Sequence, residues 1–331
     1  MSPASVRRAR SAPRVGLFAS AVLGLVVVAP GLGLALEQGT ELLSLPESTA
    51  EVFPRLRCHL VVDRESVAVD GVRVLRLETA QDADGRPVLV VPDDDTRGML
   101  ITALYDRLLE KFEDEKLGAS AREALAVLAQ RPELVREGEL LLSIDRDTPF
   151  SVVRQVLYTA GQAQFGTFLF VTHNPWQDEL RTIESALPRI GPPRQIDPEE
   201  VPPLMLSVLV GDRGLGLMGA DDVLNPDGAP ETDEAGPTVP CVSGGPCVGV
   251  DDYDWAELSR QLALIKAEHP DDLRVIVVAE PEVPYEVVVR VLDHARWAPR
   301  IPMDAEQGAW ESWRSVREEL FPFSILARGA R

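Results

Sequence analysis

One pattern of residues occurs twice in this chain, at positions 142–157 and again at 277–292. Each copy has an apolar run, then acidic residues, then a proline followed by an aromatic residue, and then a Val-Val pair. A short apolar run that ends in polar residues is typical of a buried strand, and proline favours the first turn of a helix. Each copy is therefore predicted to form a strand, a tight turn and a helix, and this unit constrains the whole fold.

The second part of each copy has the spacing of an amphipathic helix. Phe150, Val153 and Leu157 follow one another at three- and four-residue steps, and the second copy repeats these steps from Tyr285 to Leu292. Residues at such steps share one face of a helix. We expect this apolar face to pack on a sheet, with Thr148 able to cap the first helix.

The elements around the repeat follow the same order in both halves of the chain. The first half begins with a predicted hairpin at 58–69, and the second half begins with a predicted strand at 204–210. In each half, a helical pattern lies between this first element and the copy of the repeat. We therefore expect an α+β fold with two small β-β-α-β-α-β domains, each a sheet covered by helices. The other predicted elements are helices at 97–113, 121–130 and 255–265 and last strands at 168–171 and 323–327.

Composition indicates where these domains begin and end. A Pro-rich stretch at 190–203 is predicted to link a first domain at 56–189 to a second domain at 204–331. Inside the second domain, residues 221–254 are rich in Pro, Gly, Asp and Glu and contain no Lys or Arg. Such a composition favours a disordered or loosely ordered acidic insert.

The N-terminus combines basic residues with an uncharged apolar segment. Residues 15–36 carry no charge, and a bilayer requires about twenty apolar residues to be crossed by a helix. Arginines before this segment would hold residues 1–14 in the cytoplasm, so we expect a transmembrane helix at 15–36 and an extended linker at 37–55. The alternative is a cleaved signal peptide, indicated by small residues near the end of the segment. The residues concerned are Arg7, Arg8, Arg10 and Arg14 for the basic start, and Pro30, Gly31, Gly33 and Ala35 for the cleavage alternative.

Charge and cysteine content narrow the function classes. The net charge of -20 argues against nucleic-acid binding, because a polyanion would be repelled and basic residues cluster only at the extreme N-terminus. Either N-terminal alternative places the remainder of the chain across the membrane. Cys241 and Cys247 flank a Gly- and Pro-rich loop and could form a disulfide in an oxidising compartment, the alternative being two free thiols. Cys58 is predicted to be a buried strand residue.

In its order of segments the chain resembles the ExbD/TolR family of biopolymer transport proteins. Leu45-Pro46-Glu47 is similar to the linker motif of that family, and 145–150 and 280–285 are each similar to its acidic, Pro-aromatic domain motif. The resemblance implies a single-pass protein of the inner membrane with its bulk in the periplasm. It also implies a multi-span partner of the ExbB/TolQ type and a contact with an outer-membrane-linked protein or peptidoglycan.

The resemblance further implies an aspartate within the membrane helix that binds and releases protons. No residue of 15–36 is acidic here, and the corresponding place falls on Gly16, Ser20 or Ala21. We therefore expect an accessory subunit of an ExbB-ExbD/TolQ-TolR-like complex that binds periplasmic proteins and has no proton-relay residue of its own. The alternative is a soluble periplasmic or secreted binding or scaffold module whose signal peptide is cleaved.

The ends of the repeated strands are the predicted partner-binding surface. The alternative is that the acids and prolines only start the helices while the aromatic residues fill the core. Because family members are expected to act as dimers, the two halves are also expected to imitate such a pair within one chain. The partner-binding candidates are Asp145, Asp147, Phe150, Glu280, Glu282 and Tyr285.

No motif favours catalysis, a metal or a cofactor. Residues 214–219 match G-x-G-x-x-G, but the acidic residues that follow would repel phosphate, so a hairpin is the preferred interpretation. The four histidines have no partner at metal-ligand spacing, and no nucleophile motif is present. We expect a protein that binds partners and is not an enzyme.

Overall fold

The computed structural model describes residues 43–54, 58–81, 85–114, 138–186, 204–224, 236–299, 301, 305 and 307–327. The predicted membrane segment at 15–36, the helix at 121–130 and the linker at 190–203 lie outside these residues. Within the described ranges, no helix has both the length and the apolar character needed to cross a membrane.

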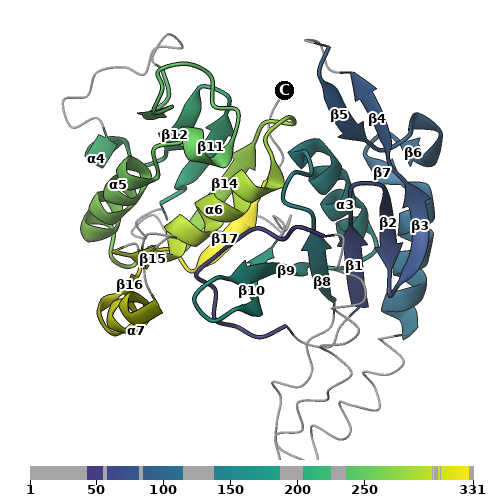
Figure 1. The fold of residues 1–331 in the computed structure, drawn as a ribbon, viewed down its shortest axis with the longest axis horizontal. Coiled ribbons are helices and arrows are strands. Elements are labelled where there is room, and N and C mark those ends of the chain that lie inside the picture. The colour runs from purple at the N-terminus through teal and green to yellow at the C-terminus, as the bar shows by residue number, and fades with distance from the viewer. Residues whose placement is uncertain are drawn as a thin grey trace, which may run out of the picture.

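Strands from both halves of the chain join in one eleven-stranded sheet (Figure 1). Its order is β13-β12-β11-β14-β17-β10-β9-β8-β1-β2-β3, so the second half occupies one side and the first half the other. The structure thus confirms a mixed fold of helices and strands, but it corrects the expectation of two separate small sheets. The reason is the parallel pairing of β10 (Glu179–Ala186) with β17 (Phe323–Leu326), which joins the halves.

The first half places three parallel strands beside an antiparallel hairpin. β1 pairs in parallel with β8, and β8 pairs in parallel with β9, while β2 and β3 extend the sheet outward from β1. A helical stretch at 102–114 comes before β8, and α3 connects β8 to β9. The bounds are β1 Cys58–Val62, β2 Ser66–Val69, β3 Val72–Arg76, β8 Glu139–Ile144, α3 Phe150–Gln162 and β9 Thr167–Asn174.

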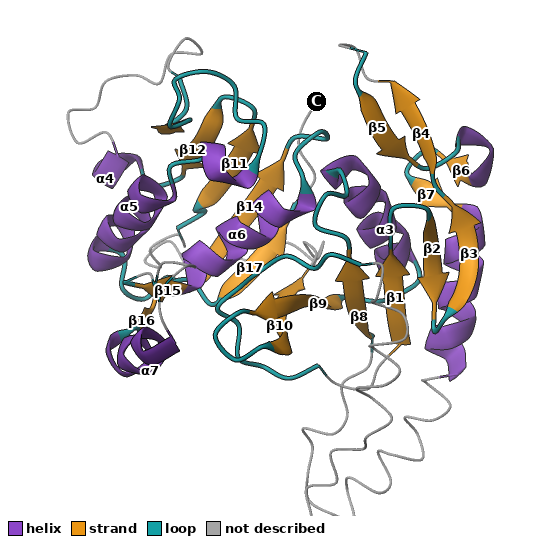
Figure 2. Ribbon diagram, in the orientation of Figure 1, coloured by secondary structure: helices purple, strands orange, loops and turns teal. Residues whose placement is uncertain are grey.

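The second half repeats this arrangement. β11, β14 and β17 are parallel, β12 forms a hairpin with β11, α5 precedes β14, and α6 connects β14 to β17. The predicted hairpin at the glycine motif is therefore confirmed, and Figure 2 shows α6 lying over β14 and β17. The bounds are β11 Ser207–Gly211, β12 Gly214–Met218, β13 Val239–Pro240, α5 Trp255–Glu268, β14 Arg274–Ala279 and α6 Tyr285–Arg296.

One hydrophobic core lies between the sheet and its helices. Val208 and Val210 of β11 are buried there, whereas Leu209 between them is 37% exposed on the opposite face. This alternation is the normal consequence of strand geometry. Side chains of α3, α5 and α6 enter the same core, so these helices cover one face of the sheet.

Several elements were not predicted from the sequence. β10 follows β9 as an antiparallel partner, and two short hairpins precede the helical stretch at 102–114. Near the C-terminus, α7 carries Trp310 and Trp313, which pack with Trp176 in a small separate cluster. The remaining bounds are β4 Glu78–Gln81, β5 Pro87–Val90, β6 Thr96–Arg97, β7 Leu100–Ile101, α4 Asp221–Leu224, β15 Trp297–Ala298, α7 Gln307–Val316 and β16 Glu318–Glu319, with 3-10 turns at Asp93–Asp95 and Val250–Asp252.

Candidate interaction site at the junction of the two halves

The two copies of the repeat meet each other through their turns, residues 145–151 and 280–286, which we call the junction. The amide of Phe150 donates to the carbonyl of Val283 at 2.8 Å, and the amide of Tyr285 donates to the carbonyl of Thr148 at 2.8 Å. These two bonds are equivalent by the alignment of the repeat. They also occupy amides at helix N-termini, which have no partner within their own helix.

A second reciprocal pair of hydrogen bonds lies beside the first. The amide of Ser151 donates to the carbonyl of Pro281 at 2.8 Å, and the amide of Glu286 donates to the carbonyl of Arg146 at 3.0 Å. Each helix is therefore capped by the turn of the other copy instead of by a side chain at its own N-cap proline. The junction has local two-fold symmetry within a single chain.

The structure corrects the predicted role of three partner-binding candidates. Phe150, Tyr285 and Asp145 are 1%, 0% and 0% exposed, so their side chains lie in the interior. The ring of Tyr285 packs against Phe170 of β9, with 5.8 Å between the ring centroids, and thus connects the two halves. Burial raises the pKa of Tyr285 well above its ordinary value.

The other three candidates, Asp147, Glu280 and Glu282, are exposed. Asp147 pairs with the guanidinium of Arg64, which also contacts the buried carboxylate of Asp145. Asp145 raises the pKa of Arg64 above its ordinary value. The accessible part of the junction is therefore mainly acidic, with one neighbouring arginine.

An ion pair also crosses the junction. The guanidinium of Arg146 donates to Glu286 through Nε at 2.9 Å and through Nη2 at 2.6 Å. Burial raises the pKa of Glu286 above its ordinary value, and the nearby Arg146 opposes this effect. A bond of this kind fixes the relative orientation of the two copies.

Residues 43–54, which we call the strap, are built into the fold. The amide of Ser44 donates to Asp145 at 3.1 Å, and the hydroxyl of Ser48 lies 2.7 Å from that of Thr172. Leu45 packs against the cluster formed by Leu141, Leu169 and Val171. In Figure 1 this purple segment runs from the region of β8 towards β10. The described part of the extended linker expected over 37–55 is therefore bonded into the fold.

The strap is fastened most closely to α6. Thr49 donates to the carboxylate of Asp293 through its amide at 3.0 and 3.1 Å and through its hydroxyl at 2.6 Å. Thr49 and Asp293 are buried. Further along, Glu51 pairs with Arg314 and Arg317 beside the tryptophan cluster. The strap thus contacts the first half at Asp145 and the second half at Asp293.

Sequence reasoning did not identify Thr49 or Asp293. The available signal was Asp293 itself, because it is an acid on a helix whose buried residues are mostly apolar. A buried carboxylate requires donors from elsewhere in the fold. Its position therefore indicated a partner, although nothing in the sequence pointed to Thr49.

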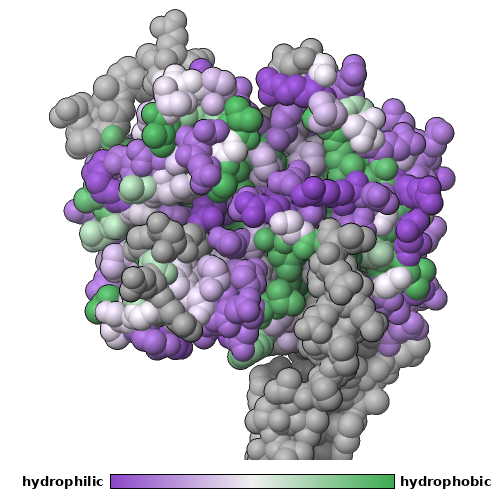
Figure 3. Space-filling model, in the orientation of Figure 1, coloured by the Kyte–Doolittle hydropathy of each residue, from purple (hydrophilic) through white to green (hydrophobic). Residues whose placement is uncertain are grey.

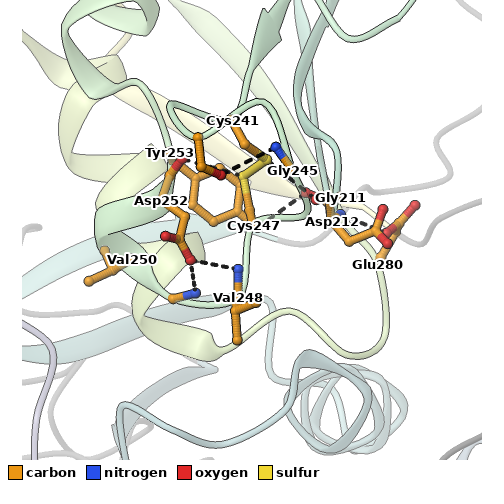
Figure 4. The surroundings of a disulfide bond; sticks show 12 residues. Gly211, Asp212, Cys241, Gly245, Cys247, Val248, Val250, Asp252, Tyr253 and Glu280 are labelled. Atoms are coloured by element: carbon orange, nitrogen blue, oxygen red, sulfur yellow. Dashed lines mark hydrogen bonds between the residues drawn. A yellow bond between two sulfur atoms is a disulfide. The ribbon is translucent and has the colours of Figure 1, made fainter. Parts of the chain in front are cut away.

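A disulfide between Cys241 and Cys247 closes a loop beside the second copy of the repeat (Figure 4). Asp252 accepts hydrogen bonds from the amides of Val248 and Gly249, and these bonds lower the pKa of its carboxyl. The described parts of the predicted acidic insert, 221–224 and 236–254, are thus ordered, which corrects the expectation for them. Residues 225–235 lie outside the described ranges.

The disulfide loop is close to Glu280. The hydroxyl of Tyr253 donates to the carbonyl of Gly211 at 3.1 Å, and Glu280 accepts from the amide of Asp212 at 3.1 Å. Burial, with help from Glu280 and Asp212, raises the pKa of Tyr253 to about 12. Figure 4 shows Asp212 and Glu280 side by side at the edge of this loop.

Among the residues the structure describes, no group of three His, Cys, Asp or Glu side chains could hold a metal ion. Figure 3 shows a band of hydrophilic side chains across the middle of the viewed face.

Comparison with protein-family models, curated proteins and solved structures finds no match to this chain.

Proposed function

We propose that this chain is a membrane-tethered periplasmic protein, an accessory subunit of an ExbB-ExbD/TolQ-TolR-like complex that works by binding other proteins. The observation that carries the proposal is the strap. It follows the apolar segment at 15–36 in the sequence and is bonded to Asp145 in one half and to Asp293 in the other. A displacement of the N-terminal segment would therefore reach the junction at Asp145 and the helix α6 of the second half at Asp293.

The two-fold junction supports the same proposal. Four reciprocal backbone bonds relate the two copies by a local two-fold, and a two-fold is also how two identical subunits pair most often. The chain would then act as an internal pseudo-dimer and need no second copy for its periplasmic part. The disulfide fits an oxidising compartment such as the periplasm.

In this proposal the exposed acids of the junction contact the partner. Asp147 and Glu282 lie on equivalent positions of the two copies, so they would present a paired acidic surface. A partner with a basic patch fits this charge. No proton-relay role is proposed, because residues 15–36 contain no acid.

The test is purification of the full chain from membranes, followed by identification of co-purifying proteins. The proposal expects an ExbB/TolQ-like multi-span protein in the eluate, and it expects the double variant Asp147→Lys/Glu282→Lys to lose a periplasmic partner. Glu268→Lys, at an exposed acid on α5, is the matched control and should retain it.

One result would refute the proposal, and a second would refute the role of its acidic surface. A mature N-terminus near Leu36, with the protein in the soluble fraction, would favour the alternative of a periplasmic or secreted binding module with a cleaved signal peptide. Retention of every partner by the double variant would remove the acidic surface from the mechanism.

A further inference from the structure

A cavity of about 520 Å³ lies where the two halves of the sheet join. β10 and β17 pair over only two residues at the C-terminal end of β10, with Ser185 opposite Ser324 and Ala186 opposite Ile325. Further back along β10, Thr182 bonds instead to Val52 of the strap. The cavity lies between the Ser185–Ser324 pair and the bond from Thr182 to Val52. It is therefore formed jointly by the two halves of the sheet and the strap.

One wall of the cavity is cationic. Arg296, at the end of α6, lines it, and the Nε of this guanidinium is buried without a hydrogen-bond partner. Among the described residues we find no ion pair for Arg296. A buried N–H donor that is left unpaired is unfavourable. Burial accordingly lowers the pKa of Arg296, despite the nearby acids.

A second cation lies near the opening. Arg274 of β14 also lines the cavity, and its side chain is exposed. The described part of the structure gives it no ion pair. An anionic group in the cavity could therefore meet a desolvated guanidinium inside and a hydrated one at the rim.

The remaining wall is largely apolar. Leu169 contributes from the face of the sheet opposite the helices, and Ile325 and Phe323 contribute from β17. Phe323 is 59% exposed, although it belongs to a strand at the centre of the sheet. Exposed aromatic surface beside a cavity is typical of a ligand-binding site.

The carboxylates near Arg296 do not neutralise it through contact. Asp293 is bonded to Thr49 of the strap, and Glu319 is exposed on β16. Glu184, which lines the cavity, is also exposed and has an interaction of its own. Solvent weakens the effect of exposed charges, so the buried Nε donor of Arg296 stays available.

We propose that this cavity binds a small amphipathic carboxylate, with its head group on Arg296 and its hydrocarbon part against Phe323, Leu169 and Ile325. A medium-chain fatty acid has this chemistry and a size suited to a cavity of this class. The inference goes beyond the proposed partner-binding function and does not depend on it. It assigns the opening between β10 and β17 a role as a ligand site.

The experiment is a calorimetric titration of the full chain with decanoate, kept below its micelle concentration, together with decanol and decylammonium. We expect one decanoate per chain and at least tenfold weaker binding of the neutral and cationic compounds. Arg296→Met should weaken decanoate binding by about ten- to a hundredfold, because a hydrogen-bonded ion pair in a partly buried place is lost. Arg274→Met should weaken it only a few-fold, since exposed ion pairs contribute little.

Further variants separate binding from folding. Arg296→Lys retains the charge and should keep part of the affinity, while Phe323→Ser changes an exposed side chain and should weaken binding without loss of the fold. Arg73→Met on β3, at an exposed arginine far along the sheet, is the matched control and should bind normally. The proposal would be overturned if decanol bound as tightly as decanoate. It would also be overturned if Arg296→Met and Phe323→Ser both bound decanoate as tightly as the original chain.

Discussion

The bond between Thr49 and Asp293 provides a quantitative test of whether the strap is part of the folded core. Thr49→Val keeps the shape of the side chain and removes the hydroxyl that donates to Asp293 at 2.6 Å. A hydrogen bond to a charged group contributes about 1.5–3 kcal/mol. Since both residues are buried, water cannot replace the lost donor, and we expect the free energy of unfolding to fall by about 2 kcal/mol.

The double-mutant cycle with Asp293→Asn isolates this bond from the other interactions of the carboxylate. In the Asp293→Asn background, Thr49→Val should lower the free energy of unfolding by much less than in the original chain, which gives a coupling energy of about 1–2 kcal/mol. The control is Thr96→Val, whose hydroxyl donates to the exposed carbonyl of Asp93 at 3.0 Å and whose loss should cost under about 0.5 kcal/mol.

Urea unfolding followed by tryptophan fluorescence is a suitable assay, because Glu51 of the strap pairs with two arginines beside the tryptophan cluster. Circular dichroism on the same samples checks that the transitions coincide, which the calculation of a free energy requires. A coupling energy below about 0.5 kcal/mol would refute the reasoning, since it would mean that water reaches Thr49.

Three further predictions concern the junction and the disulfide loop. The hydroxyl of Tyr285 is buried and has no hydrogen-bond partner in the described structure, so Tyr285→Phe should raise the free energy of unfolding by about 1 kcal/mol. Phe150→Tyr, at the equivalent position of the first copy, is the matched comparison and should lower the free energy of unfolding. A loss of stability in Tyr285→Phe would contradict this account. The disulfide closes a short loop, so the double variant Cys241→Ser/Cys247→Ser should lower the free energy of unfolding in urea by about 2 kcal/mol. This expectation fails if reduction of the original chain leaves the urea midpoint unchanged. The pKa of Tyr253 is raised to about 12 in the folded chain, above the value of about 10 for an unfolded tyrosine. Its contribution to stability is therefore complete below pH 10 and is lost as the pH rises towards 12. Stability measured between these values should fall less steeply in Tyr253→Phe than in the original chain, and equal slopes would show that Tyr253 titrates normally.

The parts of the fold that were predictable are those fixed by local pattern. The repeat at 142–157 and 277–292 forms a strand, a turn and a helix in both copies, because apolar periodicity and proline position determine these elements over a few residues. The hairpin at 58–69 and the helix after Trp255 follow for the same reason. These elements need no information from distant parts of the chain.

The parts that were not predictable depend on distant partners. Ser48 and Thr49 resemble linker residues in the sequence, but each hydroxyl finds a buried partner far along the chain. The turn acids resembled a binding surface, and Asp145 instead satisfies the amide of Ser44. A buried polar group is stable only when its partner is in place, and a local pattern cannot show that partner.

The two-fold symmetry of the junction has a consequence for where the halves can differ in function. Its equivalent bonds use the amides of Phe150, Ser151, Tyr285 and Glu286, so these four donors are not available to a partner. What distinguishes the halves lies next to the turns: Arg64 and the strap meet Asp145, whereas the loop closed by Cys241 lies next to Glu280. A partner that recognised only the repeated residues would meet the same surface twice. A partner that binds one half selectively must therefore contact the strap side or the disulfide side, and variants in these two regions should affect different partners.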